Sequence, residues 1–348
     1  MNLLHGVGDF FSLDIGTNAM RIVQLSGDEK RGWSLLKYAY VPIDERVTND
    51  VTDLGRKRFG EAILGAVGQA GIKTKNVAIG LPASKTFTSI VETDTMTERE
   101  IAKAFKYEID KYVPMPLSEA KADYIVLGLS PNDPAKTEML VSSVAKDYAE
   151  TSMETIERAG FNIIAMEPEP LAMARALAIP GAIDATLIVD FGEKSTDLVI
   201  VYKGQPRLVR SIPGGFGSLV KTLSSSLSVR EDQARQFILK FGLAEDKVEG
   251  QVFRVLSGPL DTYASELTKS VRFFQTKYIN GKVGGIVLSG YASMIPLFPE
   301  YIEAKTNTPT MKGNPWQSVR TTQEQQQALA PVASEFAVAI GLSERSND

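Results

Sequence analysis

The chain has 348 residues, of which 43% are hydrophobic and 23% charged, and its formal net charge is −4. These values are typical of a soluble globular protein that is long enough for two lobes. The negative balance gives no basic surface for nucleic acid, so we expect no nucleic-acid partner. Cysteine is absent and His5 is the single histidine, which excludes disulfides, Cys-based zinc sites and His-based triads.

The sequence predicts no membrane segment. The N-terminus lacks a basic stretch followed by a long apolar run, and no run elsewhere approaches bilayer length. Residues 343–348 (SERSND) are polar and carry no amphipathic anchor. We therefore expect a protein without direct membrane insertion, and the lack of cysteine suits a reducing cytoplasm.

The first elements in chain order predict an α/β opening. LDIGTNAMRIVQL (residues 13–25) reads as two apolar strands joined by a polar turn, and residues 33–41 read as a third strand. A helix follows, with Phe59, Ile63 and Val67 at helical spacing and Gly71 as its stop. NVAIGL (residues 76–81) reads as a short buried strand.

The next segment predicts a small sheet with helices on one side. It begins with a strand at 86–91 and a helix that the capping box Thr97-x-x-Glu100 opens. A hairpin of strands 123–129 and 139–145 follows. A second helix, opened by Asp147-x-x-Glu150 and ended by Gly160, and a strand at 161–166 complete it. This change of rhythm indicates an inserted subdomain.

The second half repeats the opening device. LIVDFGEKSTDLVIVY (residues 187–202) is again strand, Asp-x-Gly turn and strand, and 207–212 continues it. Glycines 214, 215 and 217 lead into a helix. The rest predicts a helical stretch at 229–277 broken near Gly242 and Gly250, a buried strand at 285–288, an irregular loop at 306–327 and an apolar helix at 333–342.

The repeated hairpin is the strongest indication of function. An Asp-x-Gly bend between strands directs backbone N–H groups and hydroxyls toward a phosphate, and its Asp can reach the hydrated cation that the phosphate carries. Two copies predict two related halves that close on one nucleotide.

The order of these motifs resembles the actin-like ATPase superfamily, and within it the PilM family of type IV pilus assembly proteins, followed by the division protein FtsA. The resemblance covers nearly the whole chain and rests on LDIGTNAMRIVQL, YEIDKYVPMPLSEAKADYIVLG, EPEPLAMARAL, VDFGEKSTDLVIVYKGQPRLVRSIPGG, IVLSGYASMIPL and AVAIGLSER. FtsA usually ends in a membrane-binding amphipathic helix, which this chain lacks, so PilM is favoured.

The resemblance implies an α/β, two-lobed actin-like ATPase fold (a duplicated ribonuclease H-like fold) with an inserted subdomain. The expected parts are a first lobe of residues 1–85, 161–186 and 331–348, an insertion of 86–160, a second lobe of 187–228 and 283–330, and a helical subdomain of 229–282 within the second lobe.

It also implies ATP and Mg²⁺ as ligands. The first phosphate clamp would consist of Asp14, Gly16, Thr17, Asn18 and Arg21, and the second of Asp190, Gly192, Ser195, Thr196 and Asp197. Asp14 and Asp190 would hold the metal through water. Taken alone, each turn is also an ordinary hairpin turn or a solvated turn, and only the duplication and the motif order favour a phosphate site.

Other positions leave alternatives open. Glu167 or Glu169 could orient the water that attacks the γ-phosphate, with Glu167 aligning better, or could simply favour a helix N-terminus. Gly214 and Gly215 could present N–H groups to the ligand, or merely make a turn. Ser289-Gly290-Tyr291 lies at the family's adenosine motif with Tyr291 in place of the second glycine, and Arg235 replaces the acid expected for the ribose.

In PilM relatives, a groove beside the insertion accepts the cytoplasmic N-terminal peptide of the membrane protein PilN. This implies a role for Tyr107, Ile109, Tyr112, Val113 and Pro114, although they could equally be core residues of a small sheet. We therefore expect a cytoplasmic assembly protein, peripheral at the inner membrane through this partner, with other pilus proteins or self-association as further contacts.

Two rival functions remain from the sequence. One is a filament-forming cytoskeletal ATPase of the FtsA or MreB kind, and the other is a small-molecule kinase of the same superfamily. ATP hydrolysis, if present, would be slow.

Overall fold

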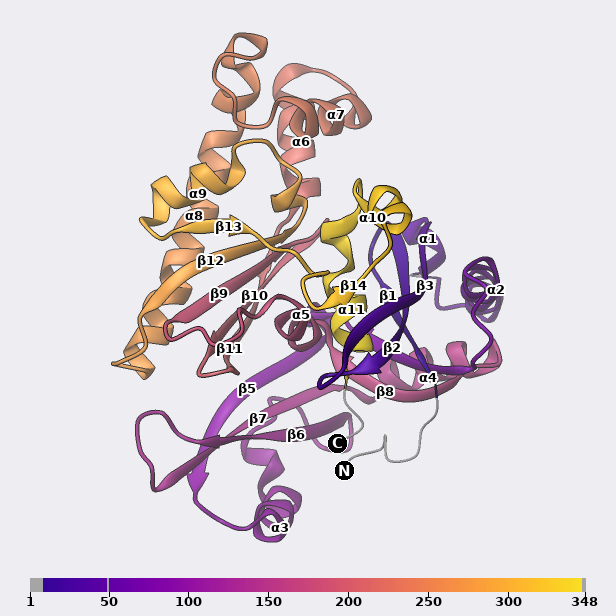
Figure 1. Cartoon of the computed structure of the whole chain (residues 1–348), viewed down its shortest axis with the longest axis vertical. Helices are drawn as coiled ribbons and strands as arrows, with labels where there is room; N and C mark the ends of the chain where they lie inside the picture. The colour runs from indigo at the N-terminus through magenta and orange to yellow at the C-terminus, as the bar shows by residue number, and fades with distance from the viewer. Residues whose placement is uncertain (1–8, 49, 346–348) are drawn as a thin grey trace. The chain divides into compact units, whose positions relative to one another are not determined.

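The computed structural model describes residues 9–48 and 50–345 (Figure 1), so His5 lies outside the described part of the chain. The chain forms two compact units, which are described separately below. Unit 1 comprises residues 1–176 and 315–348, and unit 2 comprises residues 177–314. None of the helices in the described ranges combines the length and apolar composition that crossing a bilayer requires.

Unit 1 is built on a six-stranded sheet in the order β14-β3-β2-β1-β4-β8. The strands are β1 (Phe11–Ile15), β2 (Ala19–Asp28), β3 (Gly32–Pro42), β4 (Asn76–Leu81), β8 (Asn162–Pro168) and β14 (Val319–Arg320). Strand β2 is antiparallel to both of its neighbours, β1 and β3. Strand β4 runs parallel to β1, and β8 runs parallel to β4. The predicted hairpin at 13–25 and the strands at 33–41 and 76–81 are therefore confirmed.

The two faces of β1 explain how this sheet is covered. Phe11 and Leu13 point to a core that α2 (Asp53–Gln69) and α4 (Lys146–Arg158) complete with Ile63 and Ile156. Ser12 points to the opposite face, where its hydroxyl donates to the Ala339 carbonyl of α11 (Ala337–Ser343) at 2.6 Å. Because successive side chains alternate across a strand, Asp14 lies on this second face with Ser12.

The inserted segment forms a three-stranded antiparallel sheet in the order β5-β7-β6. Its elements are β5 (Thr86–Asp94), α3 (Glu98–Glu108), β6 (Ala120–Leu129) and β7 (Lys136–Ala145). The capping box is confirmed, because the Thr97 hydroxyl accepts from the Glu100 N–H at 3.4 Å and a Glu100 carboxylate oxygen accepts from the Thr97 N–H at 2.8 Å.

The last elements of this segment differ from the expected small sheet. The strand at 161–166 is β8, which pairs with β4 in the main sheet, where the expected first-lobe range 161–186 also put it. The helix expected to start with an Asp147-x-x-Glu150 capping box begins at Lys146, with Ala145 at its N-cap and no side-chain cap. That helix, α4, packs with α2 through Ile156 and belongs to the main layer, although the sequence placed residues up to 160 in the insertion.

Unit 2 contains a five-stranded sheet in the order β11-β10-β9-β12-β13. Its strands are β9 (Ala185–Phe191), β10 (Ser195–Tyr202), β11 (Gln205–Pro213), β12 (Val283–Gly290) and β13 (Thr310–Lys312), and its longer helices are α6 (Phe216–Leu227), α7 (Glu231–Phe241), α8 (Gln251–Lys277) and α9 (Phe298–Thr306). The helices cover one sheet face and share one core with Leu187, Val189 and Leu198. The predicted breaks near Gly242 and Gly250 are confirmed.

The region expected to be an irregular loop at 306–327 is instead partly regular. It contains β13, β14 and α10 (Gln323–Leu329), and β14 pairs in parallel with β3 of unit 1 through Val319 and Trp33. Residues 315–330 therefore fall in unit 1, whereas the sequence assigned 283–330 to the second lobe. Strands of two or three residues are too short to show a period in the sequence.

Candidate functional site

The first hairpin turn closes tightly between β1 and β2. The Gly16 N–H donates to the Ala19 carbonyl at 3.0 Å, which leaves Thr17 and Asn18 at the tip. The Asn18 carbonyl accepts from the Ile43 N–H at 2.9 Å, and the Asn18 side chain is exposed. A Cβ on residue 16 would lie 2.4 Å from Nη1 of Arg21 and 3.2 Å from the Ala19 carbonyl oxygen, so a side chain here would displace the Arg21 guanidinium from its present place.

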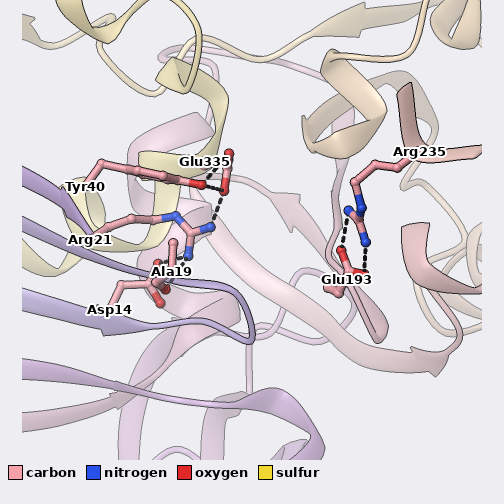
Figure 2. A network of polar contacts seen from close by, with 7 residues as sticks. All are labelled: Asp14, Ala19, Arg21, Tyr40, Glu193, Arg235 and Glu335. Atoms are coloured by element: carbon pink, nitrogen blue, oxygen red, sulfur yellow. Dashed lines mark hydrogen bonds and ion pairs between the residues drawn. The ribbon is translucent and has the colours of Figure 1, made fainter. Parts of the chain in front are cut away.

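Asp14 and Arg21 lie opposite one another in the β1–β2 register and form a buried ion pair. Nη1 of Arg21 donates to Oδ2 of Asp14 at 3.3 Å, and Nη2 donates to Glu335, which also accepts from the Tyr40 hydroxyl at 3.3 Å (Figure 2). Burial raises the pKa of Asp14, and the Arg21 charge opposes this shift. Arg21, expected as a phosphate ligand, is thus engaged by two carboxylates of its own unit.

The second hairpin turn closes in the same way. The Gly192 N–H donates to the Ser195 carbonyl at 3.0 Å, and Asp190 lies opposite Asp197 in the β9–β10 register. Strand β12 runs parallel on the other side, with Ser289 opposite Asp190. Gly290 has φ of +61°, and a Cβ there would lie 2.7 Å from the Phe191 carbonyl oxygen and 2.5 Å from Oδ1 of Asp190, so backbone conformation and close backbone packing both favour glycine at this position.

Beneath this hairpin, Asp197 and Tyr263 are both buried. Burial raises the pKa of Asp197 to about 6, although the Ser211 hydroxyl donates to it at 2.6 Å. Burial also raises the pKa of Tyr263, and the charges of Asp190 and Asp197 add to the rise. Tyr263 was not predicted from the sequence, because it comes from the distant helix α8.

The backbone N–H groups around the start of α6 are largely engaged by the second hairpin turn. The Gly214 N–H donates to the Lys194 carbonyl at 2.9 Å, and the Phe216 and Gly217 N–H groups donate to the carbonyls of the 192–193 turn at 2.9 and 3.0 Å. A Cβ on Gly215 would lie 2.3 Å from the Gly192 carbonyl oxygen. Of the two interpretations, the turn with close packing is therefore the one that the contacts favour.

Glu167 is buried and forms ion pairs with two arginines. Its Oε1 accepts from Nη2 of Arg175 at 2.7 Å, and its Oε2 accepts from Nη1 of Arg345 at 2.6 Å and Nη1 of Arg175 at 3.3 Å. Burial alone would raise the pKa of Glu167, but the two arginines outweigh it and the net shift is downward. These contacts favour anchoring of the C-terminal segment over the orientation of a water molecule.

The residues expected at the adenosine end come together in unit 2. Tyr291 follows β12 directly, and Arg235 of α7 reaches the Tyr291 ring and forms an ion pair with Glu193. Phe216, the first residue of α6, stacks on Tyr291. Glu193 and Phe216 were missed by the sequence interpretation, although Glu193 stands in the phosphate-hairpin motif itself.

The residues expected at the partner groove separate into two groups. Tyr107 is 72% exposed and Pro114 is also exposed, whereas Val113 is buried in the small core of the insertion, with Ile109 and Tyr112 packed against it. Three further apolar side chains are exposed on β6, namely Ile125, Val126 and Leu129. Within the described residues, no group of three or more acidic or histidine side chains converges as a metal site.

A protein-family model matches nearly the whole chain and shows the family to which it belongs. The family model described as type IV pilus assembly protein PilM matches residues 12–347. The chain belongs to the PilM family. The expected resemblance is therefore confirmed, and a role in type IV pilus assembly comes with the family.

Solved structures confirm the actin-like fold. A PilM–PilN type IV pilus biogenesis complex is similar over 98% of this chain and 99% of that chain, with a TM-score of 0.81 and 19% identity. The ethanolamine utilization protein EutJ of Carboxydothermus hydrogenoformans gives 0.58 at 14% identity over 98% and 90%. MreB5 of Spiroplasma citri bound to AMPPNP gives 0.53 at 13% identity over 96% and 94%.

Among curated proteins, the cell division protein FtsA of Neisseria meningitidis is 24% identical over 255 residues. The match covers 65% of this chain and 61% of the length of that relative. With the family model over nearly the whole chain, the filament-forming alternative is not favoured.

Proposed function

We propose that this protein is a cytoplasmic assembly factor of the type IV pilus machinery that binds the N-terminal tail of a PilN-like inner-membrane protein and also binds ATP with Mg²⁺. The family match carries the pilus role. The similar PilM–PilN complex supports the partner. In this proposal the protein is peripheral at the inner membrane through that partner, with further pilus proteins or self-association as additional contacts.

The insertion is the proposed docking element for the tail. Its outer strand β6 exposes apolar side chains at Ile125 (51%) and Leu129 (56%), and Tyr107 of α3 adds a third. An extended peptide can pair with an outer strand through main-chain hydrogen bonds and place alternate side chains on such apolar positions. The exposed apolar side chains of β6 are the observation on which the docking proposal depends.

The docking proposal is tested by fluorescence anisotropy with a labelled N-terminal cytoplasmic peptide of the PilN-like partner. Ile125→Lys should weaken binding at least about tenfold, because it places a charge on an apolar contact. Ile183→Lys, at a side chain that is 91% exposed in unit 2, is the matched control and should leave the affinity unchanged. Equal binding by both variants would contradict docking at β6.

The nucleotide proposal rests on the two hairpins. Both turns are closed by a glycine N–H, and each delivers a strand-end Asp, at Asp14 and at Asp190. Carboxylates suit Mg²⁺, which keeps most of its waters and accepts one or two such groups. Asp190 is our main candidate for the metal shell, because it lies near the end of β9, two residues before Gly192, whose N–H closes the second turn.

Equilibrium titration with ATP tests this part. Asp190→Asn should reduce Mg²⁺-dependent ATP binding by about tenfold or more, because a carboxylate near the metal shell is lost. Asp246→Asn, at an exposed aspartate after α7, is the control and should bind like the parent protein. Absence of saturable Mg²⁺-dependent binding by the parent protein would refute the nucleotide proposal.

A further inference from the structure

Four side chains of unit 2, here called the Arg235 cluster, fill one place beside the second hairpin. They are Glu193, Phe216, Arg235 and Tyr291. Nη1 of Arg235 donates to Oε2 of Glu193 at 3.0 Å and Nη2 donates to Oε1 at 2.5 Å, which is a two-pronged ion pair (Figure 2). The Arg235 guanidinium carbon also lies 4.9 Å from the Phe216 ring centre and 5.8 Å from that of Tyr291.

The two rings of the cluster are themselves stacked. The Phe216 and Tyr291 ring centres lie 4.2 Å apart with an interplanar angle of 11°.

The Glu193 side chain is 13% exposed and that of Arg235 is 32% exposed, so the ion pair is largely shielded from water. Hydrogen bonding to Glu193 raises the pKa of Arg235, which keeps the guanidinium charged against the rings.

The cluster stands where the sheet topology favours ligands. Strands β9 and β12 are parallel neighbours that end at Phe191 and Gly290. Glu193 follows the end of β9, and Tyr291 follows the end of β12. In open α/β sheets, ligands bind outside the carboxyl ends of the parallel strands. The Arg235 cluster therefore occupies the edge at which unit 2 would receive the nucleoside of a nucleotide held by the second hairpin.

The residue types do not fit an open nucleoside position. A ribose hydroxyl is well served by a carboxylate, but α7 presents Arg235 here, and the neighbouring carboxylate Glu193 is already bound to that arginine. An adenine needs a free flat surface, but the flat surfaces of Phe216 and Tyr291 are stacked on one another and against the guanidinium.

We infer that the Arg235 cluster occupies the nucleoside position of unit 2, so that a nucleotide binds only in exchange for the contacts of Arg235 with Glu193 and the two rings. This inference rests on the proposed function, because it concerns the same nucleotide. It makes Arg235 and Tyr291 residues that limit affinity for the nucleoside, whereas the phosphate contacts belong to the hairpin.

The test compares ATP with inorganic tripolyphosphate, each with Mg²⁺, by isothermal titration calorimetry of the full chain. Arg235→Lys keeps the charge but loses the two-pronged pair and the flat stacking surface. It should raise ATP affinity about fivefold, since a stacked cation and an ion pair no longer compete with the base. Affinity for tripolyphosphate, which has no base, should stay within about twofold.

Two further variants complete the design. Tyr291→Ala should raise ATP affinity in the same way, because it removes one ring of the stack. Arg230→Lys is the matched control, since Arg230 forms a similar two-pronged pair with Asp232 at 3.0 and 2.6 Å near the start of the same helix, outside the cluster. It should change neither affinity. Thermal melts of each variant check that the fold is retained.

The possible failures are distinguishable. If Arg235→Lys and Tyr291→Ala bind ATP as the parent does, or more weakly, while tripolyphosphate still binds, the cluster does not compete with the base and the inference is wrong. If neither ATP nor tripolyphosphate binds to any variant, the nucleotide proposal falls, and the inference falls with it.

Discussion

At the scale of single residues, unit 1 holds a buried chain of charges that links distant parts of the sequence. Arg21 contacts both Asp14 and Glu335, and the exposed fractions of the Arg21 and Glu335 side chains are 13% and 7%. Removing one partner of a buried pair leaves the other charge uncompensated, which costs more than losing an exposed pair. The same arrangement explains why Arg21 is poorly placed to bind a phosphate without first releasing a carboxylate.

Glu335→Ala should therefore lower the free energy of unfolding by about 3 kcal/mol, because the buried Arg21 charge loses one of the two carboxylates that pair with it. Asp28→Ala, which removes an exposed partner of Arg31 in a pair with 86% and 51% exposed side chains, should change it by about 0.5 kcal/mol or less. Urea unfolding of both variants gives the comparison. Similar losses in the two variants would contradict a special role of the buried pair.

The buried carboxyl group of Glu344 should make the free energy of unfolding depend on pH. Burial raises its pKa to about 7, although the Ser318 hydroxyl and Arg175 oppose the shift. The folded state thus favours the protonated acid, so this contribution is complete below the ordinary pKa of 4.5 and is lost as the pH rises through about 7.

Glu344→Gln should remove that loss, so the variant gains up to about 3 kcal/mol relative to the parent protein between pH 4.5 and pH 8. The measurement is the difference in urea unfolding free energy between the two proteins across this range. A difference that stays constant with pH would show that Glu344 does not titrate in the expected window.

Some residue contacts could be predicted from the sequence and others could not. Asp14 and Arg21 lie on the two strands of one hairpin, so their pairing follows from the register of a short turn. Glu335 joins them from the far end of the chain. Arg235 of α7 meets Glu193 although two strands and a helix separate them in the sequence. Such long-range contacts depend on packing and leave no periodic signal in the sequence.

At the scale of elements, two helices pack so closely at Gly341 that this position has no room for a side chain. A Cβ on Gly341 of α11 would lie 1.8 Å from the carbonyl oxygen of Ala172 in α5 (Glu169–Leu177), so the two helices approach through a position that has no side chain. Arg175 adds a hydrogen bond from Nη1 to the Gly341 carbonyl at 2.5 Å.

Gly341→Ala should therefore destabilise the protein by about 3 kcal/mol or more, because backbone has to move to relieve the overlap. Gly65→Ala is the matched control within α2, where an added Cβ would meet no atom within 4 Å, and it should stabilise the protein by up to about 1 kcal/mol. Calorimetric melting of both variants checks the opposite signs, and two shifts of the same sign would contradict the packing argument.

The element predictions succeeded where the pattern was long or carried a turn signal. Both Asp-x-Gly hairpins, the strand at 76–81 and the breaks in the long helical stretch have clear alternation, glycines or helical spacing. The predictions failed at β13 and β14, which are three and two residues long, and at the N-terminus of α4, where the backbone starts the helix without a side-chain cap.

At the scale of the whole molecule, the motif order gave the family, and the family model confirms it over residues 12–347. The compact units change at residues 176/177 and 314/315, whereas the expected lobes change at 186/187 and 330/331. At the second crossing the difference has a structural reason, because β14 pairs with β3 of unit 1. The candidate site is less predictable than the fold, since Arg235 and Tyr291 depart from the family pattern and fill space by mutual stacking.

The most direct test of the account is the affinity of the parent protein for the N-terminal cytoplasmic peptide of its PilN-like partner, measured by fluorescence anisotropy with and without Mg²⁺ and ATP. One ligand changes the affinity for a second ligand only if it binds one conformational state of the protein more tightly than another. The account predicts saturable binding of the peptide under both conditions, with an affinity that ATP changes by about threefold or more. Absence of peptide binding under both conditions would contradict it.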